Sequence, residues 1–267
     1  MPNSRTIVVT GVTSGIGAAT AEILKEGGAA VIGVDISEPD AGTVDRFVCM
    51  DQSDPASIDA AISAIPDGLD GVVNSAGVPP ADRFPPVQVL KTNFFGLRDF
   101  TQKVLPGIKR GGAIVNLSSG AGMGWSQNIP LLREALAITD LNEVDDFVAR
   151  HQIHNDGIDN LAAYPLSKQL LIVWTGSAFP IWKKTGVRMN ALAPGAVATP
   201  ILQDFLTAFG EESASRIQAI GELSARDVAK YVVDLLDPDD SWINGVTIPI
   251  ERGAITYGGL SKLALFG

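Results

Sequence analysis

The stretch "TIVVTGVTSGIGAATAEIL", residues 6–24, decides the fold. A short β-branched run is followed by a turn and by apolar residues at helical spacing, which predicts a strand, a turn and a helix. Glycines in the turn let backbone N–H groups and the positive helix N-terminus approach a pyrophosphate closely. A loop that merely needs positive φ angles would also be glycine-rich, so both interpretations of the turn stay open. Its candidate binding residues are Gly11, Ser14, Gly15, Ile16 and Gly17.

The same alternation continues along the chain and sets the fold class. The later strands are nearly continuous apolar runs, which indicates a parallel sheet covered by helices on both faces. No linker, repeat or low-complexity tract divides the chain. We therefore predict an α/β fold: a single-domain Rossmann-like doubly wound parallel sheet of about seven strands, spanning residues 1–267. The expected strands lie within residues 6–11, 29–35, 46–51, 69–77, 112–120, 187–195 and 245–250, and helices are expected at 54–65 and along 89–108.

Composition and charge narrow the class further. The 267 residues are 46% hydrophobic, enough to bury a full core. A formal charge of −10 argues against a nucleic-acid partner, because a phosphate backbone binds clustered Lys and Arg. The single Cys49 excludes an internal disulfide, and "MPNSRTIVVT" at the start lacks the pattern of a signal peptide. No apolar run approaches the roughly 18 residues of a membrane helix, so we expect a cytoplasmic protein with no membrane partner.

Two acidic residues follow strands near the predicted turn. Asp35 ends the second apolar run about 20 residues after the glycines, where a carboxylate can accept hydrogen bonds from an adenosine ribose. The same carboxylate would repel a 2′-phosphate, and no Arg or Lys lies beside it, so NAD is favoured over NADP. Asp51, after the third run, fits either a contact with the adenine edge or an ordinary turn cap.

The stretch "YPLSK", residues 164–168, contains a candidate proton-transfer pair. Tyr164 and Lys168 lie one helical turn apart and share a face. The Lys168 ammonium, together with the positive charge of oxidised nicotinamide, would favour the phenolate of Tyr164. Taken alone, the two residues also fit a core aromatic and a solvated charge. Pro165 suits the first position of a helix, which would put Tyr164 at the helix start.

Taken in order, the motifs of this sequence resemble those of the short-chain dehydrogenase/reductase family. Together they span nearly the whole chain. Within the family, the sequence is most similar to a bacterial branch that acts on coniferyl alcohol or 3α-hydroxysteroids. The motifs are TGxxxGxG at 10–17, "NSAG" at 74–77, "KTNFFG" at 91–96, "IVNLSS" at 114–119, YxxxK at 164–168, and "APG" with a following threonine at 193–199.

The resemblance implies a catalytic set of Asn93, Ser119, Tyr164 and Lys168. Ser119 would hold the substrate oxygen, and Asn93 would hold a water molecule that links Lys168 to solvent. Adjacent side chains of a strand point to opposite faces, so only one of the serines 118 and 119 should reach the substrate, and the family pattern selects the second.

The resemblance also implies a larger cofactor-binding set. Asn74 and Gly77 would let the backbone pass close to the cofactor ribose, although "NSAG" also fits a simple strand-ending turn. Thr199 would hydrogen-bond the nicotinamide amide or the phosphates. The NAD-binding residues expected beyond the glycine turn are Asp35, Asp51, Asn74, Ala76, Gly77, Tyr164, Lys168, Pro194, Gly195, Val197 and Thr199.

His151 and His154 are candidate metal ligands, because histidines three apart share a helix face. No third ligand is evident from nearby spacing, so we interpret both as surface residues and predict no metal.

Residues 125–160 occupy a place where the family has a much shorter connection. "PLLREALAI" and "NEVDDFVARHQI" predict two short amphipathic helices, the second with Val144, Phe147 and Val148 on one face. Their apolar faces would cover the substrate cleft or form a subunit interface. Related enzymes with an insertion here are dimers because it obstructs a face used in the common tetramer. We therefore expect a homodimer, with a tetramer as the alternative.

The substrate pocket is expected to contain Trp125, the insertion and the apolar stretch "AVATPILQDFLTAF" after "APG". "ERGA" at 251–254 replaces the Asp-Gly-Gly common in the family, which alters the tail near the cleft. The leading hypothesis is an NAD-dependent oxidoreductase that transfers hydride between nicotinamide and a hydrophobic aromatic or alicyclic alcohol or its carbonyl product. The alternative is a dinucleotide-sensing binding protein without turnover, although a sensor has no chemical need for the catalytic set.

Overall fold

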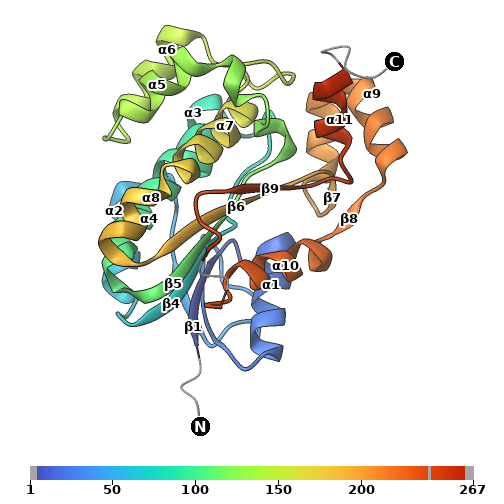
Figure 1. The fold of residues 1–267 in the computed structure, drawn as a ribbon. Coiled ribbons are helices and arrows are strands. Elements are labelled where there is room, and N and C mark those ends of the chain that lie inside the picture. The colour runs from blue at the N-terminus through green and yellow to red at the C-terminus, as the bar shows by residue number, and fades with distance from the viewer. Residues whose placement is uncertain (1–4, 240–241, 262–267) are drawn as a thin grey trace.

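The computed structural model describes residues 5–239 and 242–261, which form a parallel sheet between two helical layers (Figure 1). The expectations for the N-terminal start and for the ends of the 1–267 domain lie partly outside the described residues.

The strands are β1 (Thr6–Thr10), β2 (Ala30–Asp35), β3 (Arg46–Cys49), β4 (Leu69–Asn74), β5 (Ile108–Leu117), β6 (Arg188–Pro194), β7 (Val197–Ala198), β8 (Leu223–Ser224) and β9 (Thr247–Ile250). The α-helices are α1 (Gly15–Glu26), α2 (Pro55–Ala64), α3 (Pro86–Leu90), α4 (Gly96–Val104), α5 (Ile129–Ala137), α6 (Glu143–His151), α7 (Ala163–Gly176), α8 (Ala178–Thr185), α9 (Leu202–Ile220), α10 (Ala225–Leu235) and α11 (Ala254–Ser261). A π-helical turn at Lys91–Phe95 and 3₁₀ turns at Leu105–Gly107, Gly120–Gly122 and Trp125–Gln127 complete the described elements.

The main sheet has seven strands in the order β3-β2-β1-β4-β5-β6-β9, and every neighbouring pair is parallel. This confirms the predicted doubly wound fold. The chain starts in the middle at β1, runs outward to β3, and then crosses back to β4 on the other side of β1. In open sheets of this kind, ligands bind where the strand order reverses, at the carboxyl ends of the strands.

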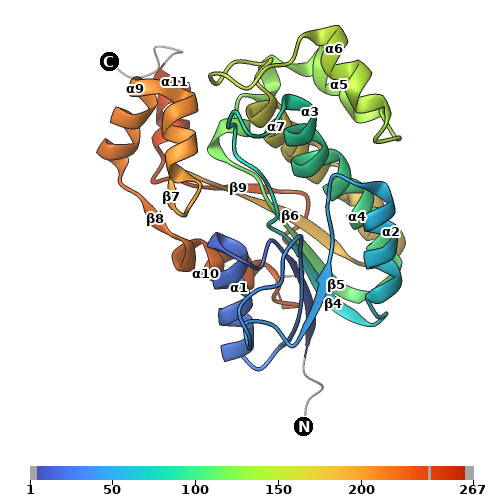
Figure 2. The same ribbon diagram turned by 180° about the vertical axis from the view of Figure 1, so that it is seen from behind.

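Alternating strand residues enter two separate cores, which explains why the strands are apolar throughout. Ile7 and Val9 pack with Val31 against α1 and α10 on one face. Val8 and Ile114 pack into the other core, which contains residues from α2, α3, α4 and α7. Both views show α1 and α10 together on one side of the sheet (Figures 1 and 2). Within the described residues, every helix falls short of the length and apolar character that a membrane crossing requires.

The small sheet formed by β7 and β8 was not predicted. Each of these strands has only two residues, so neither gives a periodic pattern in the sequence. The fifth predicted strand also begins earlier than expected, at Ile108, and its pairing with β4 shifts register between Leu69 and Gly71. The pairing that matters for the site lies beyond this shift, at Asn74 and Asn116.

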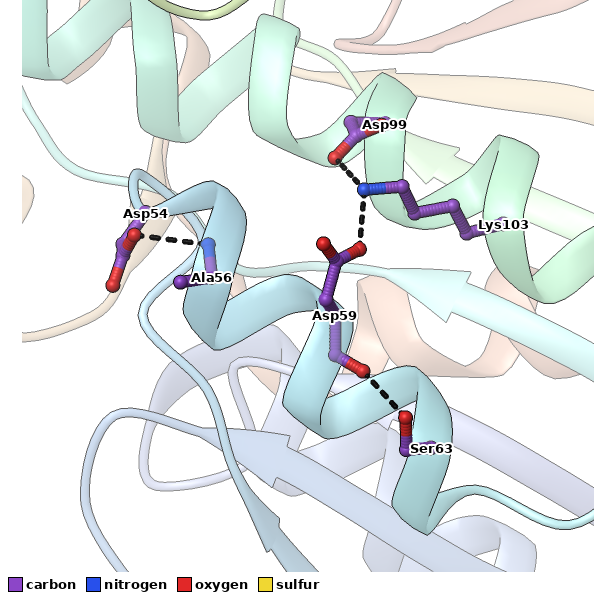
Figure 3. Close-up of polar contacts among 6 residues, drawn as sticks. All are labelled: Asp54, Ala56, Asp59, Ser63, Asp99 and Lys103. Carbon is purple, nitrogen blue, oxygen red and sulfur yellow. Dashed lines mark hydrogen bonds and ion pairs between the residues drawn. The ribbon is translucent and has the colours of Figure 1, made fainter.

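The predicted helical stretch along 89–108 is α3, a π-helical turn and α4 in succession. The π turn brings one residue more into the helix than regular spacing allows, and such turns are frequent at functional sites. It contains Asn93. The neighbouring α2 begins at an Asp54 cap, and Lys103 of α4 reaches both Asp59 of α2 and Asp99 of its own helix (Figure 3).

The insertion forms the two expected amphipathic helices, α5 and α6, which lie over α3 and α7 in both views (Figures 1 and 2). Val144 and Phe147 are fully buried, and they join the core that also contains Leu132 and Leu170. The Arg98 guanidinium donates to the carbonyl oxygens of Leu136 and Ile138. The apolar faces are thus buried within the same chain, and neither a cleft cover nor a subunit interface is needed to bury them.

Candidate active site

A cleft of about 1960 Å³ runs across the carboxyl ends of the strands. Strand ends and the loops that follow them form its walls, as the topology requires. Of the predicted site residues, the cleft is lined by Gly11, Ser14, Gly15, Ile16, Asp35, Asp51, Ala76, Gly77, Ser119, Tyr164, Lys168, Pro194, Gly195, Val197 and Thr199. Three do not line it: Gly17, Asn74 and Asn93.

The glycine turn is packed backbone against backbone. Gly11 has φ +75°, and a Cβ there would lie 2.8 Å from the backbone of Ala76. A Cβ on Gly17 would lie 2.0 Å from the Gly11 carbonyl oxygen. Gly17 therefore brings α1 close to β1 and does not line the cleft itself, and its part in cofactor binding stays a prediction.

The N-terminus of α1 opens into the cleft beside this turn. Its cap residue, Ser14, makes no side-chain cap bond, and the first turn contains no acidic side chain. The free N–H groups and the positive end of the helix dipole are therefore available to an anion. Thr199, from the far wall, lies close enough that a Cβ on Gly15 would be 3.3 Å from its methyl group. The cradle fits a dinucleotide pyrophosphate between the two walls.

Asp35 ends β2 at the rim of the cleft and is tied to the glycine turn. One carboxylate oxygen accepts hydrogen bonds from the Thr13 backbone N–H at 3.0 Å and from its hydroxyl at 2.8 Å. The other accepts from the Ile36 N–H at 2.7 Å. Among the described residues that line the cleft, the only cationic side chains are Lys168 and Arg252. Neither belongs to the glycine turn or to β2, so the carboxylate at this rim is not neutralised by a neighbouring cation.

Asp51 follows β3 and caps a turn, as one of its two interpretations expects, whereas its contact with the adenine edge stays a prediction. Its carboxylate accepts from the Ser53 N–H at 2.8 Å and from the Ser53 hydroxyl at 2.7 Å, so it caps a turn. It also lines the cleft on the same wall as Asp35.

The two serines after β5 point to different places, as strand alternation requires. The Ser118 hydroxyl is buried and donates to the Lys168 carbonyl oxygen at 3.0 Å. The Ser119 hydroxyl lines the cleft, accepts from the Ala121 N–H at 3.2 Å and lowers the pKa of the nearby Tyr164 hydroxyl. A Cβ on Gly122 would lie 2.7 Å from the Lys168 backbone. Ser118 and Gly122 therefore fasten the end of β5 to α7, and this close packing joins Ser119 to a tyrosine far along the chain.

Tyr164 and Lys168 share the face of α7 that borders the cleft. Tyr164 is 8% exposed and Lys168 is 6% exposed. The Lys168 Nζ donates to the Leu117 carbonyl oxygen at 2.9 Å and lies 5.4 Å from the centre of the Tyr164 ring. Burial raises the pKa of Tyr164 to about 12, and the hydrogen bond with Ser119 opposes that rise. Burial lowers the pKa of Lys168 to about 8. In the protein alone, the loss of hydration therefore outweighs the attraction expected between the phenolate and the ammonium.

The helix of Tyr164 starts two residues earlier than predicted. α7 begins at Ala163, so Pro165 is its third residue and not its first. The proline is tolerated because N–H groups of the first turn have no partner within the helix. The carbonyl four residues before it belongs to Leu161, which lies outside the helix and accepts from the His154 N–H at 3.2 Å.

Asn93 lies behind the cleft wall and is fully buried. Its amide oxygen accepts from the Val78 N–H at 2.8 Å, and its amide nitrogen donates to the Val78 carbonyl at 2.9 Å. A Cβ on Gly77 would approach both Asn93 Oδ1, at 3.1 Å, and Lys168 Nζ, at 3.9 Å. The π turn thus brings Asn93 to the loop beside Lys168, and the water-holding role stays a prediction.

The Asn74 side chain does not line the cleft, and the approach of its backbone to the cofactor ribose stays a prediction. Its amide nitrogen donates to Thr101 at 2.9 Å and to Asn116 at 2.8 Å, inside the core. It faces the layer that contains α4 because side chains alternate along β4, which puts Asn74 on the same face as Val72 and beside Asn116 of the next strand. The loop beyond it is held by Thr10, whose hydroxyl accepts from the Ser75 and Ala76 N–H groups at 3.1 and 3.0 Å. The TGxxxGxG motif begins at Thr10 but does not predict that its hydroxyl holds this loop.

The wall beyond Tyr164 is apolar. Phe205 and Phe209 of α9 contact the Tyr164 ring, with ring centres 4.7 and 6.2 Å away. Trp125, which was expected here, does not line the cleft. The insertion contributes only residues near its two ends, because α5 and α6 pack behind α3 and α7. The apolar lining residues at this end include Val78, Phe84, Met123, Ile158, Ile201, Leu202, Phe205, Phe209 and Ile255.

The tail "ERGA" closes this end of the cleft. Glu251 is buried, and its carboxylate accepts from the Ile255 N–H at 2.7 Å. Arg252 has φ +58° and donates to the Ile220 carbonyl oxygen at 2.7 Å. The two residues bring the ends of α9 and β9 together at the cleft.

His151 and His154 do not share a helix face, because α6 ends at His151 and Gln152 is left-handed. His151 lies 2.9 Å from Glu134, and His154 lies 3.5 Å from Asp159. In the part of the chain that the structure describes, no three His, Cys, Asp or Glu side chains gather as a metal ion would need.

Known proteins match this chain over almost its whole length. Residues 5–130 match the family model described as short chain dehydrogenase, and residues 148–254 match the model described as enoyl-(acyl carrier protein) reductase. The chain is 40% identical over 261 residues to the coniferyl-alcohol dehydrogenase of Pseudomonas sp. strain HR199, covering 95% of this chain and 98% of that protein. It is 31% identical over 254 residues to the 3-alpha-hydroxysteroid dehydrogenase/carbonyl reductase of Comamonas testosteroni, covering 92% and 95%.

Among solved structures, the 3-alpha-hydroxysteroid dehydrogenase from Pseudomonas sp. B-0831, complexed with NADH, has a TM-score of 0.80 at 28% identity. That match covers 95% of this chain and 98% of the other. The chain belongs to the short-chain dehydrogenase/reductase family. It is an NAD(P)-dependent oxidoreductase that acts on alcohol and carbonyl groups.

Proposed function

We propose that the protein is an NAD-dependent dehydrogenase of hydrophobic aromatic or alicyclic alcohols, which also reduces the corresponding carbonyl compounds. The observation that carries this proposal is that Ser119, Tyr164 and Lys168 line one cleft, with Tyr164 and Lys168 on the same face of α7. Bound NAD supplies the hydride acceptor for the carbon of the alcohol.

Each of the three side chains has a separate task in alcohol oxidation. The Ser119 hydroxyl donates to the substrate oxygen and orients it toward Tyr164. The Tyr164 phenolic oxygen takes the hydroxyl proton as hydride leaves the carbon. Lys168, whose pKa of about 8 keeps it mostly protonated at neutral pH, lowers the cost of the phenolate. Asn93 holds the Gly77–Val78 loop beside Lys168 and is proposed to hold a water molecule there.

The preference for NAD over NADP is proposed from Asp35. Its carboxylate is fixed by Thr13 and Ile36 at the rim where an adenosine ribose would lie. A 2′-phosphate placed there would meet an anion with no cation beside it. The solved relative complexed with NADH agrees with this preference.

The substrate class is proposed from the apolar wall and from the relatives. The phenylalanines of α9 offer ring edges and faces to a planar or alicyclic substrate. The relatives named for coniferyl alcohol and for 3-alpha-hydroxysteroids indicate two ring-containing alcohols to test first.

We also propose a homodimer, because α5 and α6 cover the outer sides of α3 and α7. A tetramer by light scattering would contradict this assembly.

The test is a screen of NAD reduction with coniferyl alcohol, 3α-hydroxysteroids and alicyclic alcohols, run beside Tyr164→Phe. We expect turnover with at least one ring-containing alcohol, and a loss of about 10²- to 10⁴-fold in the variant. Equal activity in the variant would contradict the assigned proton transfer. Binding of NAD without turnover of any alcohol would favour the dinucleotide-sensing alternative.

A further inference from the structure

The first part of α9, residues 202–209, lies over Tyr164 as an aromatic cover. The Phe205 ring meets the Tyr164 ring edge to face at 4.7 Å, and Phe209 packs beside Phe205 at 5.7 Å. The cover leaves Tyr164 only 8% exposed. A substrate ring that brings its hydroxyl to Ser119 and Tyr164 must therefore pass or displace these two phenylalanines.

The aromatic cover is fastened to the opposite wall of the cleft. Arg83, in the loop between β4 and α3, donates both guanidinium nitrogens to the Asp204 carboxylate at 2.9 and 2.6 Å. The two residues are 121 positions apart in the chain. Two-bond pairs of this kind fix direction as well as distance. In both views α9 stands on the opposite side from α3 and α7 (Figures 1 and 2), so the ion pair crosses between them.

Other contacts strengthen the same junction. The guanidinium carbon of Arg83 lies 4.9 Å from the centre of the Phe84 ring. The Phe84 carbonyl accepts from the Asn155 side chain at 2.7 Å, and the Gly157 N–H donates to the Ala208 carbonyl at 3.1 Å. The cover is therefore held by the loop after β4 and by the loop before α7, which both border the substrate end.

A hinge separates the cover from the rest of α9. Gly210 has φ 78° and ψ 177°, a conformation that only glycine adopts readily, so the helix is broken at that point. Beyond the break, the far end of α9 is held by Arg252 through the Ile220 carbonyl. Gly210 therefore divides α9 into the cover and a second segment, and each has its own contact with another part of the chain.

We infer that Arg83 and Asp204 are positioning residues of the reaction: their ion pair latches the aromatic cover across the cleft and holds Phe205 and Phe209 against Tyr164, where they form the wall that meets the substrate ring. The inference rests on the proposed function for its kinetic consequence. The pair is 56% exposed at Arg83 and 22% exposed at Asp204. A pair this exposed contributes little energy, which suits a latch that has to open at every turnover.

The first experiment measures hydrogen exchange in peptides covering residues 202–209, without cofactor or substrate. Arg83→Gln and Asp204→Asn each speed exchange there by about two- to five-fold, the range expected for an exposed ion pair. The charge swap, Arg83→Asp with Asp204→Arg, returns exchange toward the wild-type rate. The matched control is Arg226→Gln, because Arg226 forms similar exposed pairs with Glu22 and Glu26 on the other side of the sheet. It leaves exchange in residues 202–209 unchanged.

The second experiment uses the best alcohol from the screen. Each single variant raises the KM for the alcohol about two- to five-fold and leaves kcat and the KM for NAD unchanged, and the swap restores the KM. Wild-type exchange and wild-type KM in both single variants would overturn the latch, as would a swap that restores neither. If no alcohol turns over, the proposed function fails, and the exchange result still decides whether the latch exists.

Discussion

The two ends of the cleft are built in different ways. Around Gly11 the wall is backbone packed on backbone, so that added Cβ atoms at Gly11 and Gly17 would fall within 2.8 and 2.0 Å of main-chain atoms. Around Tyr164 the wall consists of side chains from β5, α7 and α9 that meet through hydrogen bonds and ring contacts. A backbone-built site leaves a local trace in the sequence, because only glycine fits it. A site assembled from side chains that are distant in the sequence can be predicted only from several motifs that occur in a characteristic order.

The difference predicts that the substrate end depends most on single side chains. Ser119→Ala removes the donor to the substrate oxygen, and kcat/KM falls about 10²- to 10³-fold in an NADH-absorbance assay. Ser118→Ala is the control, because that hydroxyl is buried and donates to the Lys168 carbonyl oxygen. It changes kcat/KM by less than about threefold and lowers the free energy of unfolding by about 1 kcal/mol. A larger loss of kcat/KM in the Ser118 variant than in the Ser119 variant would show that Ser118, and not Ser119, holds the substrate oxygen.

At the cofactor end, the comparison predicts a loss of stability. Gly17→Ala places a methyl group against the Gly11 carbonyl, so the free energy of unfolding in urea falls by at least about 3 kcal/mol. Gly176→Ala at the end of α7 is the matched control, because an added Cβ there meets nothing within 4 Å. Its effect stays below about 1 kcal/mol. Equal effects in the two variants would show that the close approach of α1 to β1 is not needed.

Lys168 lies at the boundary between the two ends, and its burial predicts a pH effect. The unfolded chain keeps this proton up to about pH 10.5, whereas the folded chain releases it near 8, so the unfolded state binds more protons in between. The free energy of unfolding of the wild type therefore rises relative to Lys168→Met, by about 2 kcal/mol between pH 8 and 10. Urea titrations of both proteins without cofactor measure it. A difference that stays constant with pH would mean that Lys168 is hydrated in the folded protein.

The smallest predicted effect concerns the choice of cofactor. Asp35→Asn removes the anion at the ribose rim and keeps a side chain of similar size, so the ratio of kcat/KM for NADP to that for NAD rises about 10- to 100-fold. Asp51→Asn is the control, because Asp51 caps a turn through Ser53. It leaves that ratio within about threefold of wild type. If the Asp35 variant kept the wild-type ratio, the preference for NAD would have to come from another part of the cleft wall.

The fold was predictable because its signals are local and periodic. Seven apolar strands, the glycine turn and the Asp54-Pro55 start of α2 lie where the pattern put them. The roles of Asn74 and Gly17 were not predictable, since a motif does not say whether a side chain faces the cleft or the core. For Asn74 the answer comes from alternation along β4, which puts it on the core face with Val72, where Asn116 of β5 accepts its hydrogen bond.

The substrate end could be predicted only in outline. The apolar stretch after "APG" does line the cleft, but Trp125 does not, because its position depends on how the 3₁₀ turn at Trp125–Gln127 leaves the loop after β5. The amphipathic pattern of the insertion predicted α5 and α6. Such a pattern does not say which surface the apolar face packs against. In the structure, that surface is the core formed with α3 and α7. The ion pair between Arg83 and Asp204 has no sequence signal at all.

The π-helical turn at Lys91–Phe95 has a consequence for how this family member tolerates change in length. A π turn is an α-helix that has gained one residue, and each residue in a helix advances about 100° around the axis. Deleting a single residue from this turn would restore a regular helix and swing Asn93 away from Val78, while most of the core packing of α3 and α4 could be kept. If Asn93 has the proposed catalytic role, loss of one codon here would separate folding from catalysis: a folded dinucleotide-binding protein would remain, without the asparagine beside Lys168.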